Sequence, residues 1–418
     1  MQQGTPQKTR VLFFAWGDSI HARRRIGIFC EDSSFEVGVV STFRYDFKNA
    51  QIFYLSDEHK VNEKQNRATR FLIRKCHAAT AKTLHFALRF FGSVSLDECS
   101  NLVRDLFLVR RYVRDFKPDV IFLQTLMYPC YLSYLCLGRI PMMVTFWNGD
   151  VTWWAKWMGI ERAFKKQIVR HGAQRANAIT VNSGAALQAC LGYGVAEDKV
   201  NLIRYPGVDL QMFSPPSDKT QVRKQLGLQG EGRIVFCPRG IGGYLNSDII
   251  IEAAAIVIGH HPDTRFLFLV AEGSRGEWQS HLQRAEELGI TANVITVGKI
   301  PWESMPAYYQ AADAMISISS NDSLPNCMLE AMACGTPVIM GDIPQIGEWV
   351  RDGENGYSVP PRDPAALADR IERIFTDRDG VAEGFIRDNI ALVQREVDSR
   401  IVADSIKRLV REIAQASN

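Results

Sequence analysis

Short apolar segments alternate with helix-like segments along both halves of this chain of 418 residues. In the first half, predicted strands lie near residues 11–16, 36–40, 119–123, 142–146, 177–181 and 200–204. In the second half, strands near 233–238, 265–270, 293–297, 314–318 and 337–340 alternate with helices at about 247–259, 276–288, 303–311, 326–334 and 364–376. Such alternation is typical of parallel sheets with helices on both faces. The sequence therefore predicts an α/β chain with doubly wound sheets.

A segment rich in proline and polar residues separates the two halves. It reads PGVDLQMFSPPSDKTQ from Pro206 to Gln221, which suits a linker. A chain of this length has room for two or three domains of about 100–200 residues each. We predict an N-terminal domain over residues 1–205 and a C-terminal domain over residues 206–379.

Two carboxylates, Asp322 and Glu330, flank the start of a predicted helix in the C-terminal half. Residues 319–338 read SSNDSLPNCMLEAMACGTPV, between two apolar segments. In open parallel sheets, ligands bind beyond the carboxyl ends of the strands, where helix N-terminal amides favour anions. Acids beside such amides indicate a ligand with both phosphates and hydroxyls, such as a nucleotide sugar. The alternative is that both acids merely stabilise the helix N-terminus.

The residues around this pair resemble the signature of the retaining glycosyltransferases of family 4, which have the GT-B fold. That signature is Glu, seven residues and Glu, followed by Ala-x-Ala-x-Gly-x-Pro-Val. This chain has Asp322, seven residues and Glu330, and then Ala331, Ala333, Gly335, Pro337 and Val338. Asp for the first Glu keeps the charge and removes one methylene group.

Other segments extend the resemblance along the chain. They are GDSIHARRR from Gly17, Asn182 and Ser183 after AITV, PGVDLQMF from Pro206, MPAYYQAADAMISIS around Tyr309 and Asp313, and WVRDGENGYSVPPRDPAALADRI from Trp349. The resemblance implies two Rossmann-like domains that face a central cleft. It also implies that the C-terminal segment, residues 380–418, crosses back to the first domain.

The resemblance assigns candidate residues to the sugar donor. Asp322 holds the sugar, Glu330 accepts hydrogen bonds from a ribose diol, and Arg239 binds the diphosphate. Tyr244 stands where the family has a second cation, a Lys, so we expect glycine amides after Arg239 and the side chain of Asn246 to help. Further donor-binding candidates are Gly17 after the first strand, Lys299 near the nucleotide base, and Ser323, Leu324, Pro325 and Asn326 at the helix start.

On the acceptor side, the segment FWNGDVTWW starts at Phe146. Many relatives have a His near the reacting sugar at this place, whereas this chain has Trp147, Asn148 and Asp150. An indole ring offers a stacking surface for a sugar. Asp150 is a candidate to orient an acceptor hydroxyl, with helix capping as the alternative.

The implied reaction is hexosyl transfer with retention at the anomeric carbon, without a cofactor or a metal ion. The pair Asp377 and Asp379 lies between predicted helices, so we expect it to cap a helix rather than bind a metal. We expect a role in polysaccharide, glycolipid or glycoconjugate biosynthesis. Two alternatives remain: a catalytically weak homologue that binds a sugar nucleotide or a protein, and a nucleotide-sugar epimerase.

Charge is unevenly distributed between the two halves. Residues 1–204 contain 29 Lys and Arg against 17 Asp and Glu, and the remainder contains 20 against 29. Residues 64–91 contain basic residues interleaved with Phe and Leu, and no acid. This pattern suits contact with an anionic membrane and hence a lipid-linked acceptor, with a solvated basic helix face as the alternative. No nucleic-acid recognition motif accompanies the charge.

The remaining partners and the location follow from composition. The expected donor is UDP- or GDP-linked, and the acceptor presents a hydroxyl group. Nine cysteines without paired metal-binding spacing favour reduced thiols in the cytoplasm. Because we find no secretory or membrane-spanning segment, we expect a cytoplasmic protein, with the inner face of the plasma membrane as a peripheral location.

Overall fold

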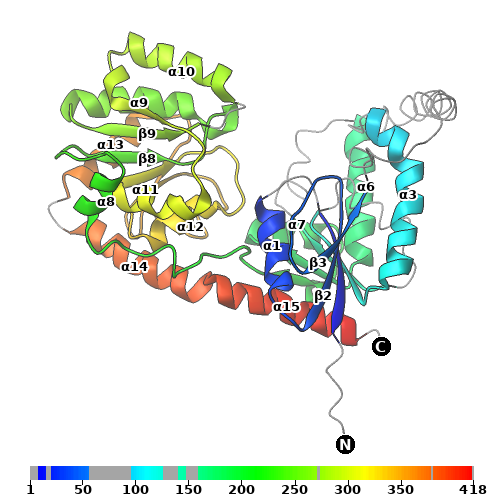
Figure 1. Ribbon diagram of the computed structural model, residues 1–418. Helices are drawn as coiled ribbons and strands as arrows, with labels where there is room; N and C mark the ends of the chain where they lie inside the picture. Colours follow the sequence, from blue (N-terminus) through cyan, green and yellow to red (C-terminus); the bar gives the residue numbers. More distant parts are fainter. Residues whose placement is uncertain are drawn as a thin grey trace, which may run out of the picture. The chain divides into compact units, whose positions relative to one another are not determined.

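The structure of the protein is a computed structural model, and it describes residues 8–15, 20–55, 96–125, 140–146, 159–270, 274–377 and 380–416. The chain divides into two compact units (Figure 1). The first contains residues 1–203 and 403–418, and the second contains residues 204–402. This division lies two residues before the predicted boundary.

The first unit is built on a parallel sheet of seven strands in the order β3-β2-β1-β4-β5-β6-β7. The strands are β1 (Thr9–Phe14), β2 (Phe35–Ser41), β3 (Ala50–Tyr54), β4 (Val120–Leu123), β5 (Met142–Thr145), β6 (Ala178–Val181) and β7 (Val200–Leu202). Its helices are α1 (Ile20–Cys30), α3 (Leu96–Phe116), α6 (Gly159–Arg175) and α7 (Gly184–Gly192). Every residue of β4, β5 and β6 is buried, as expected of strands covered on both faces.

The second unit is built on a parallel sheet of six strands in the order β10-β9-β8-β11-β12-β13. They are β8 (Ile234–Cys237), β9 (Arg265–Leu269), β10 (Val294–Val297), β11 (Ala314–Ser317), β12 (Val338–Gly341) and β13 (Tyr357–Val359). The helices are α8 (Lys219–Gln225), α9 (Ser247–His260), α10 (Arg275–Glu287), α11 (Met305–Ala311), α12 (Asn326–Ala333) and α13 (Pro364–Phe375). Counted within this unit, the strand order is 3-2-1-4-5-6, that of dinucleotide-binding sheets.

The C-terminal helices are α14 (Val381–Glu396), which belongs to the second unit, and α15 (Ser399–Gln415), in which the chain passes from the second unit to the first after residue 402. Helix α14 lies along α12, with Val393 in the core of the second unit. The end of α15 belongs to the first unit, where Lys407 pairs with Asp32 at 3.1 Å. The sequence predicted that residues 380–418 pack onto the first domain, and in the structure residues 380–402 group with the second unit and residues 403–418 with the first.

The membrane-binding candidate, residues 64–91, lies outside the described residues. Within the described part of the chain, no helix is both long and apolar enough to cross a bilayer.

Candidate functional site

The candidate site of the second unit lies at the carboxyl ends of β8 and β11. These strands are neighbours in the sheet, and the chain proceeds from them in opposite directions, to β9 and to β12. Side chains that follow the two strands therefore converge at the point where the strand order reverses, where open α/β sheets bind ligands. Arg239 follows β8 and Asp322 follows β11.

Arg239 and Asp322 form an ion pair at this point. The Nη2 atom of Arg239 lies 2.7 Å from Oδ2 of Asp322, and their side chains are 29% and 12% exposed. The second oxygen of Asp322, Oδ1, accepts a hydrogen bond from the Ser323 amide at 2.8 Å. Among the described residues, the buried Nε atom of Arg239 has no hydrogen-bond partner. The Nε–H group of Arg239 is therefore available to donate a hydrogen bond to a further anionic group.

Arg239 keeps its charge in this position. Burial acts to lower its pKa, but neighbouring groups, among them Cys327 and Asp322, raise the pKa above its usual value. The guanidinium group consequently stays protonated at any pH at which the protein is folded.

Glu330 lies on α12, inside the second unit, and only 7% of it is exposed. Its Oε2 atom accepts a hydrogen bond from the hydroxyl group of Tyr309 at 3.0 Å. Its Oε1 atom accepts a longer bond from the indole nitrogen of Trp302 at 3.4 Å. The sequence prediction missed both contacts: Tyr309 entered it only as part of a motif, and Trp302 was given no role.

The N-terminus of α12 is open. No side chain caps it, and its first turn contains no acidic residue. The Oδ1 atom of Asn326, the first residue of the helix, is buried without a hydrogen-bond partner among the described residues. The predicted donor-binding residues Ser323, Leu324, Pro325 and Asn326 thus form the entry to a helix whose amides are available to an anion.

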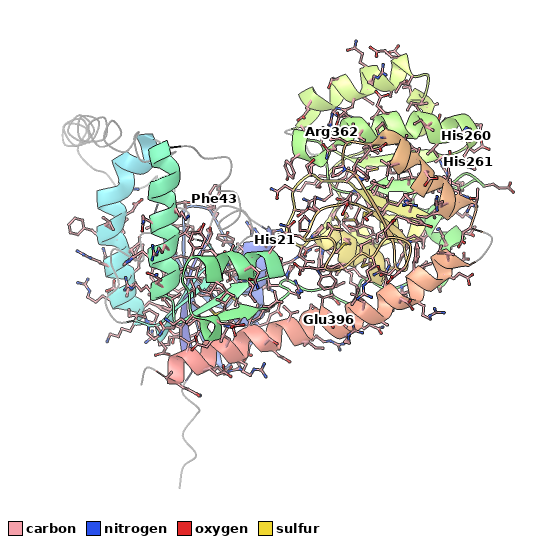
Figure 2. All side chains as sticks on the ribbon, turned by 180° about the vertical axis from the view of Figure 1, so that it is seen from behind. His21, Phe43, His260, His261, Arg362 and Glu396 are labelled. Atoms are coloured by element: carbon pink, nitrogen blue, oxygen red, sulfur yellow. The ribbon has the colours of Figure 1, made fainter. Side chains whose placement is uncertain are left out.

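Helix α9, which follows β8, differs in charge at its N-terminus. Its first turn carries Asp248, and Arg362, which is labelled in Figure 2, contacts this carboxylate at 2.8 Å. An anion at the start of α9 would meet the charge of Asp248, whereas α12 presents no acid in its first turn. Electrostatics therefore favour α12 as the anion-binding helix.

Asn246 is buried, and its side chain is committed to the protein. Its amide donates to the carbonyl oxygen of Ile318 at 2.7 Å and to Oγ of Ser320 at 2.8 Å, so it fixes the loop after β11. Its Oδ1 atom accepts a hydrogen bond from Arg362 at 3.3 Å. The sequence analysis expected the Asn246 side chain to help bind a diphosphate. In the structure its amide instead positions the loop that carries Asp322.

Two other residues considered in the sequence analysis, Tyr244 and the candidate Lys299, are exposed. Tyr244 is 43% exposed, and its carbonyl oxygen accepts a hydrogen bond from the Ser320 amide at 2.8 Å. Lys299 is exposed on the loop after β10. The remaining candidates, Gly17, Trp147, Asn148 and Asp150, lie outside the described residues.

Metal-ligand side chains do not gather in the described ranges: no group of three or more His, Cys, Asp or Glu there is arranged to hold an ion. Asp377 instead accepts hydrogen bonds from the amides of Val381 and Ala382, at 3.1 and 2.7 Å, at the start of α14. Capping is therefore the role of this aspartate in the structure.

Comparisons with known families divide the chain much as the structure does. The family described as "Glycosyl transferases group 1" matches residues 218–388, and "Glycosyltransferase Family 4" matches residues 66–212. A D-inositol 3-phosphate glycosyltransferase of Acidothermus cellulolyticus is 31% identical over 49% of this chain and 46% of its own length. One of Frankia alni is 34% identical over 44% and 46%. The matched region thus spans about half the length of these curated relatives.

Solved structures resemble the chain over nearly its full length. Anabaena Alr3699/HepE in complex with UDP and glucose has a TM-score of 0.73 at 18% identity, covering 97% of this chain and 100% of that one. A sucrose-phosphate synthase of Thermosynechococcus elongatus has a TM-score of 0.73 at 18% identity, covering 98% and 100%. At these identities the similarity establishes the fold, that of two α/β domains with parallel sheets.

Proposed function

The chain belongs to the glycosyltransferases of the family 4 type, which have the GT-B fold, and we propose that it transfers a sugar from a nucleoside-diphosphate sugar to a hydroxyl group. The observation that carries this proposal is the position of Arg239, paired with Asp322 beside the open N-terminus of α12. A diphosphate carries more charge when it leaves than when it is bound to the sugar. A preorganised cation and helix amides therefore stabilise the transition state more than the substrate.

The two carboxylates bind the neutral parts of the donor. Glu330 accepts hydrogen bonds from the ribose diol, and Asp322 accepts them from hydroxyl groups of the transferred sugar. Because Asp322 also pairs with Arg239 at 2.7 Å, a contact of Asp322 with the sugar links sugar binding to the orientation of the guanidinium group. The nucleotide is UDP or GDP; UDP is bound in the structurally similar HepE.

The proposed chemistry retains the configuration of the anomeric carbon and uses no metal ion. The bond from that carbon to the phosphate oxygen breaks while a bond to the acceptor oxygen forms on the same face. The proton of the acceptor hydroxyl passes to the departing phosphate oxygen, and the bonding electrons leave with the diphosphate. Arg239 and the α12 amides hold the charge that develops on that group.

The acceptor belongs to polysaccharide, glycolipid or glycoconjugate biosynthesis in this proposal. Relatives named D-inositol 3-phosphate glycosyltransferases act on a phosphorylated polyol, so a free polyol phosphate belongs in the acceptor panel beside lipid-linked sugars. Liposomes with and without anionic lipid test whether residues 64–91 bring the protein to a membrane.

Nucleotide release tests the proposal. The purified protein is incubated with UDP- and GDP-linked sugars and acceptors, and the free nucleoside diphosphate and the anomeric configuration of the product are measured, with and without EDTA. We expect release with one donor class, a retained anomer and no effect of EDTA, and a loss of about 100-fold or more in Arg239→Ala and Glu330→Ala. Absence of turnover, or turnover that both substitutions leave unchanged, would contradict the proposal.

A further inference from the structure

The carboxylate of Glu330 is held by two neutral donors from one short stretch of chain. Tyr309 lies on α11, and Trp302 precedes that helix by three residues. Each of them donates to a different oxygen of Glu330, at 3.0 Å and 3.4 Å. Each carboxylate oxygen has two lone pairs, so an oxygen that accepts one hydrogen bond from the protein can accept another from a hydroxyl group.

Both donors are themselves fixed. Tyr309 is fully buried, its ring lies 5.4 Å from that of Phe236, and its carbonyl oxygen accepts a hydrogen bond from the hydroxyl group of Thr336 at 2.7 Å. Thr336 follows α12, the helix that carries Glu330, so the hydrogen bond ties α11 to α12. The ring of Trp302 packs against that of Phe213 at 5.6 Å. Tyr309 therefore cannot change its direction without moving its neighbours, whereas Trp302 is half-buried and its contact with Phe213 restrains it less.

Tyr309 remains a donor at every relevant pH. Burial, and then the charge of Glu330, raise the pKa of its hydroxyl group well above the usual value. The hydroxyl group therefore keeps its proton and directs it at the carboxylate.

From this geometry we propose that Tyr309 and Trp302 are positioning residues, which hold the Glu330 carboxylate in the orientation that accepts the two ribose hydroxyl groups of the donor. The proposal rests on the proposed function, because it assigns the nucleotide to this site. The ribose of the nucleotide sugar donates two hydrogen bonds through its hydroxyl groups. The protein provides a carboxylate whose rotation is already restricted. Preorganisation of this kind adds affinity without a new contact to the ligand.

The test compares ribonucleotides with their dideoxy forms. Binding of UDP, GDP and their 2′,3′-dideoxy analogues to the full-length chain is measured by isothermal titration calorimetry. The wild type is compared with Tyr309→Phe, Trp302→Phe and Glu330→Gln. Tyr308→Phe is the matched control, because Tyr308 is the adjacent residue of α11 and stacks on Phe236 at 5.7 Å. Thermal unfolding of each variant accompanies the titrations.

We expect the wild type and Tyr308→Phe to prefer the ribonucleotide by about 10-fold or more, the range of hydrogen bonds to a charged group. Tyr309→Phe should reduce this preference to about threefold, and Trp302→Phe should reduce it less because its bond is longer. Affinity for the dideoxy form should change by less than about twofold in both variants. In the Glu330→Gln background, Tyr309→Phe should not lower the preference for the ribonucleotide further, since the carboxylate to which Tyr309 donates is already replaced.

The outcomes separate the two proposals. If the wild type binds neither nucleotide, the proposed function fails and this inference fails with it. If the wild type prefers the ribonucleotide and Tyr309→Phe and Trp302→Phe keep the full preference, the positioning role alone is wrong. Equal weakening of the ribo and dideoxy forms would likewise overturn it, because a merely structural role would affect both.

Discussion

At the scale of single residues, the site depends on one cation. Arg239 is the charged residue that follows β8 at the reversal of the strand order, and its partner Asp322 comes from a segment far along the chain. The sequence motif predicted both residues. Their pairing could not be predicted, because it depends on β8 and β11 being neighbours, which no local pattern specifies.

A second arginine, at the opposite end of β8, provides a matched control for Arg239. Arg233 precedes β8, at its amino end, and donates to the carbonyl oxygen of Phe375 at 3.2 Å. We expect Arg239→Met to reduce the transfer rate by about 100-fold or more, since it removes the charge that faces the leaving group. Arg233→Met should keep the rate within about threefold of the wild type. Steady-state kinetics at saturating donor compare them, and an equal loss in both variants would contradict the role of Arg239.

Other residue roles required the structure. The sequence presented Asn246 as a polar side chain near a glycine turn, but its left-handed backbone (φ 53°) and its bonds to Ile318 and Ser320 make it a support for the loop. A buried hydrogen bond of this kind follows from tertiary packing, and residue type alone predicts solvent or ligand contact equally well.

At the scale of elements, one aspartate precedes β11 and another follows it, and the two make different contacts. Asp313, before the strand, contacts Lys219 at 2.8 Å, Arg223 at 2.6 Å and the amide of Ile234 at 2.7 Å. Asp322, after the strand, contacts Arg239 in the candidate site. We therefore expect the aspartate at the amino end of the strand to contribute to stability and the one at the carboxyl end to contribute to ligand binding.

Replacing each aspartate by asparagine tests this division. Asp313→Asn should lower the free energy of unfolding by about 1–3 kcal/mol, because it leaves the partly buried Arg223 and the more exposed Lys219 without their partner, and should leave nucleotide affinity unchanged. Asp322→Asn should reduce turnover by about 10-fold or more and lower the free energy of unfolding by no more than about 1 kcal/mol, because Arg239 remains partly exposed. Urea unfolding and donor kinetics give both quantities. A reversed pattern would contradict the assignment of the two ends.

The ion pair between Asp32 and Lys407, which holds α15 on the first unit, predicts that the stability of the protein depends on pH. Partial burial acts to raise the pKa of Asp32, but hydrogen bonds from Ser34 and the pairing with Lys407 lower it to about 2. Because the pKa is about 3.9 in an unfolded chain, the stabilisation is fully present above that pH and is lost as the pH falls towards 2.

Asp32→Asn therefore tests the anchor of α15. At pH 7 the variant should be less stable than the wild type by about 1 kcal/mol, the range of exposed ion pairs, and the difference should shrink between pH 4 and pH 2. Thermal unfolding at pH 7, 4 and 3 measures it, with hydrogen exchange of residues 403–415 as the local readout. Arg411 also contacts the Asp32 carboxylate, at 3.3 Å. A difference that stays constant over this range would show that the pairs of Asp32 with Lys407 and Arg411 do not stabilise the helix.

The accuracy with which the sequence predicted the helices and strands depends on how deeply each element is buried. Fully buried strands such as β8 and β11 were predicted to within about two residues, because their residues are almost all apolar. The edge strands β3 and β13 were missed: β3 reads AQIFY, of which only Phe53 is buried, and β13 has three residues. The sequence pattern of α14 does not indicate which unit it packs on, and in the structure its contacts with α12 place it with the second unit.

At the scale of the whole molecule, the second unit is a continuous stretch of chain, residues 204–402, with its own sheet and core. The sequence predicted this unit to within two residues at its start because the proline-rich linker marks it. Its end lies inside α15, where the helical pattern continues without interruption, so no sequence signal marks it.

A fragment of residues 204–402 should fold alone and bind the nucleoside diphosphate with a Kd within about 10-fold of the full chain, because all donor-contacting residues proposed here that the structure describes lie in it. It should not transfer sugar. Circular dichroism and calorimetry check both expectations, with Arg239→Met in the fragment as the control. A folded fragment without affinity would place part of the nucleotide site elsewhere in the chain.

The most direct test of the central claim is a crystal structure of the full chain with UDP or GDP, whichever binds. We predict that the β-phosphate lies within hydrogen-bond distance of the Arg239 guanidinium group and of amides at the N-terminus of α12, with both ribose hydroxyl groups on Glu330. A nucleotide bound at the N-terminus of α9, or at a place that leaves Arg239 and Glu330 without contact to it, would contradict the account.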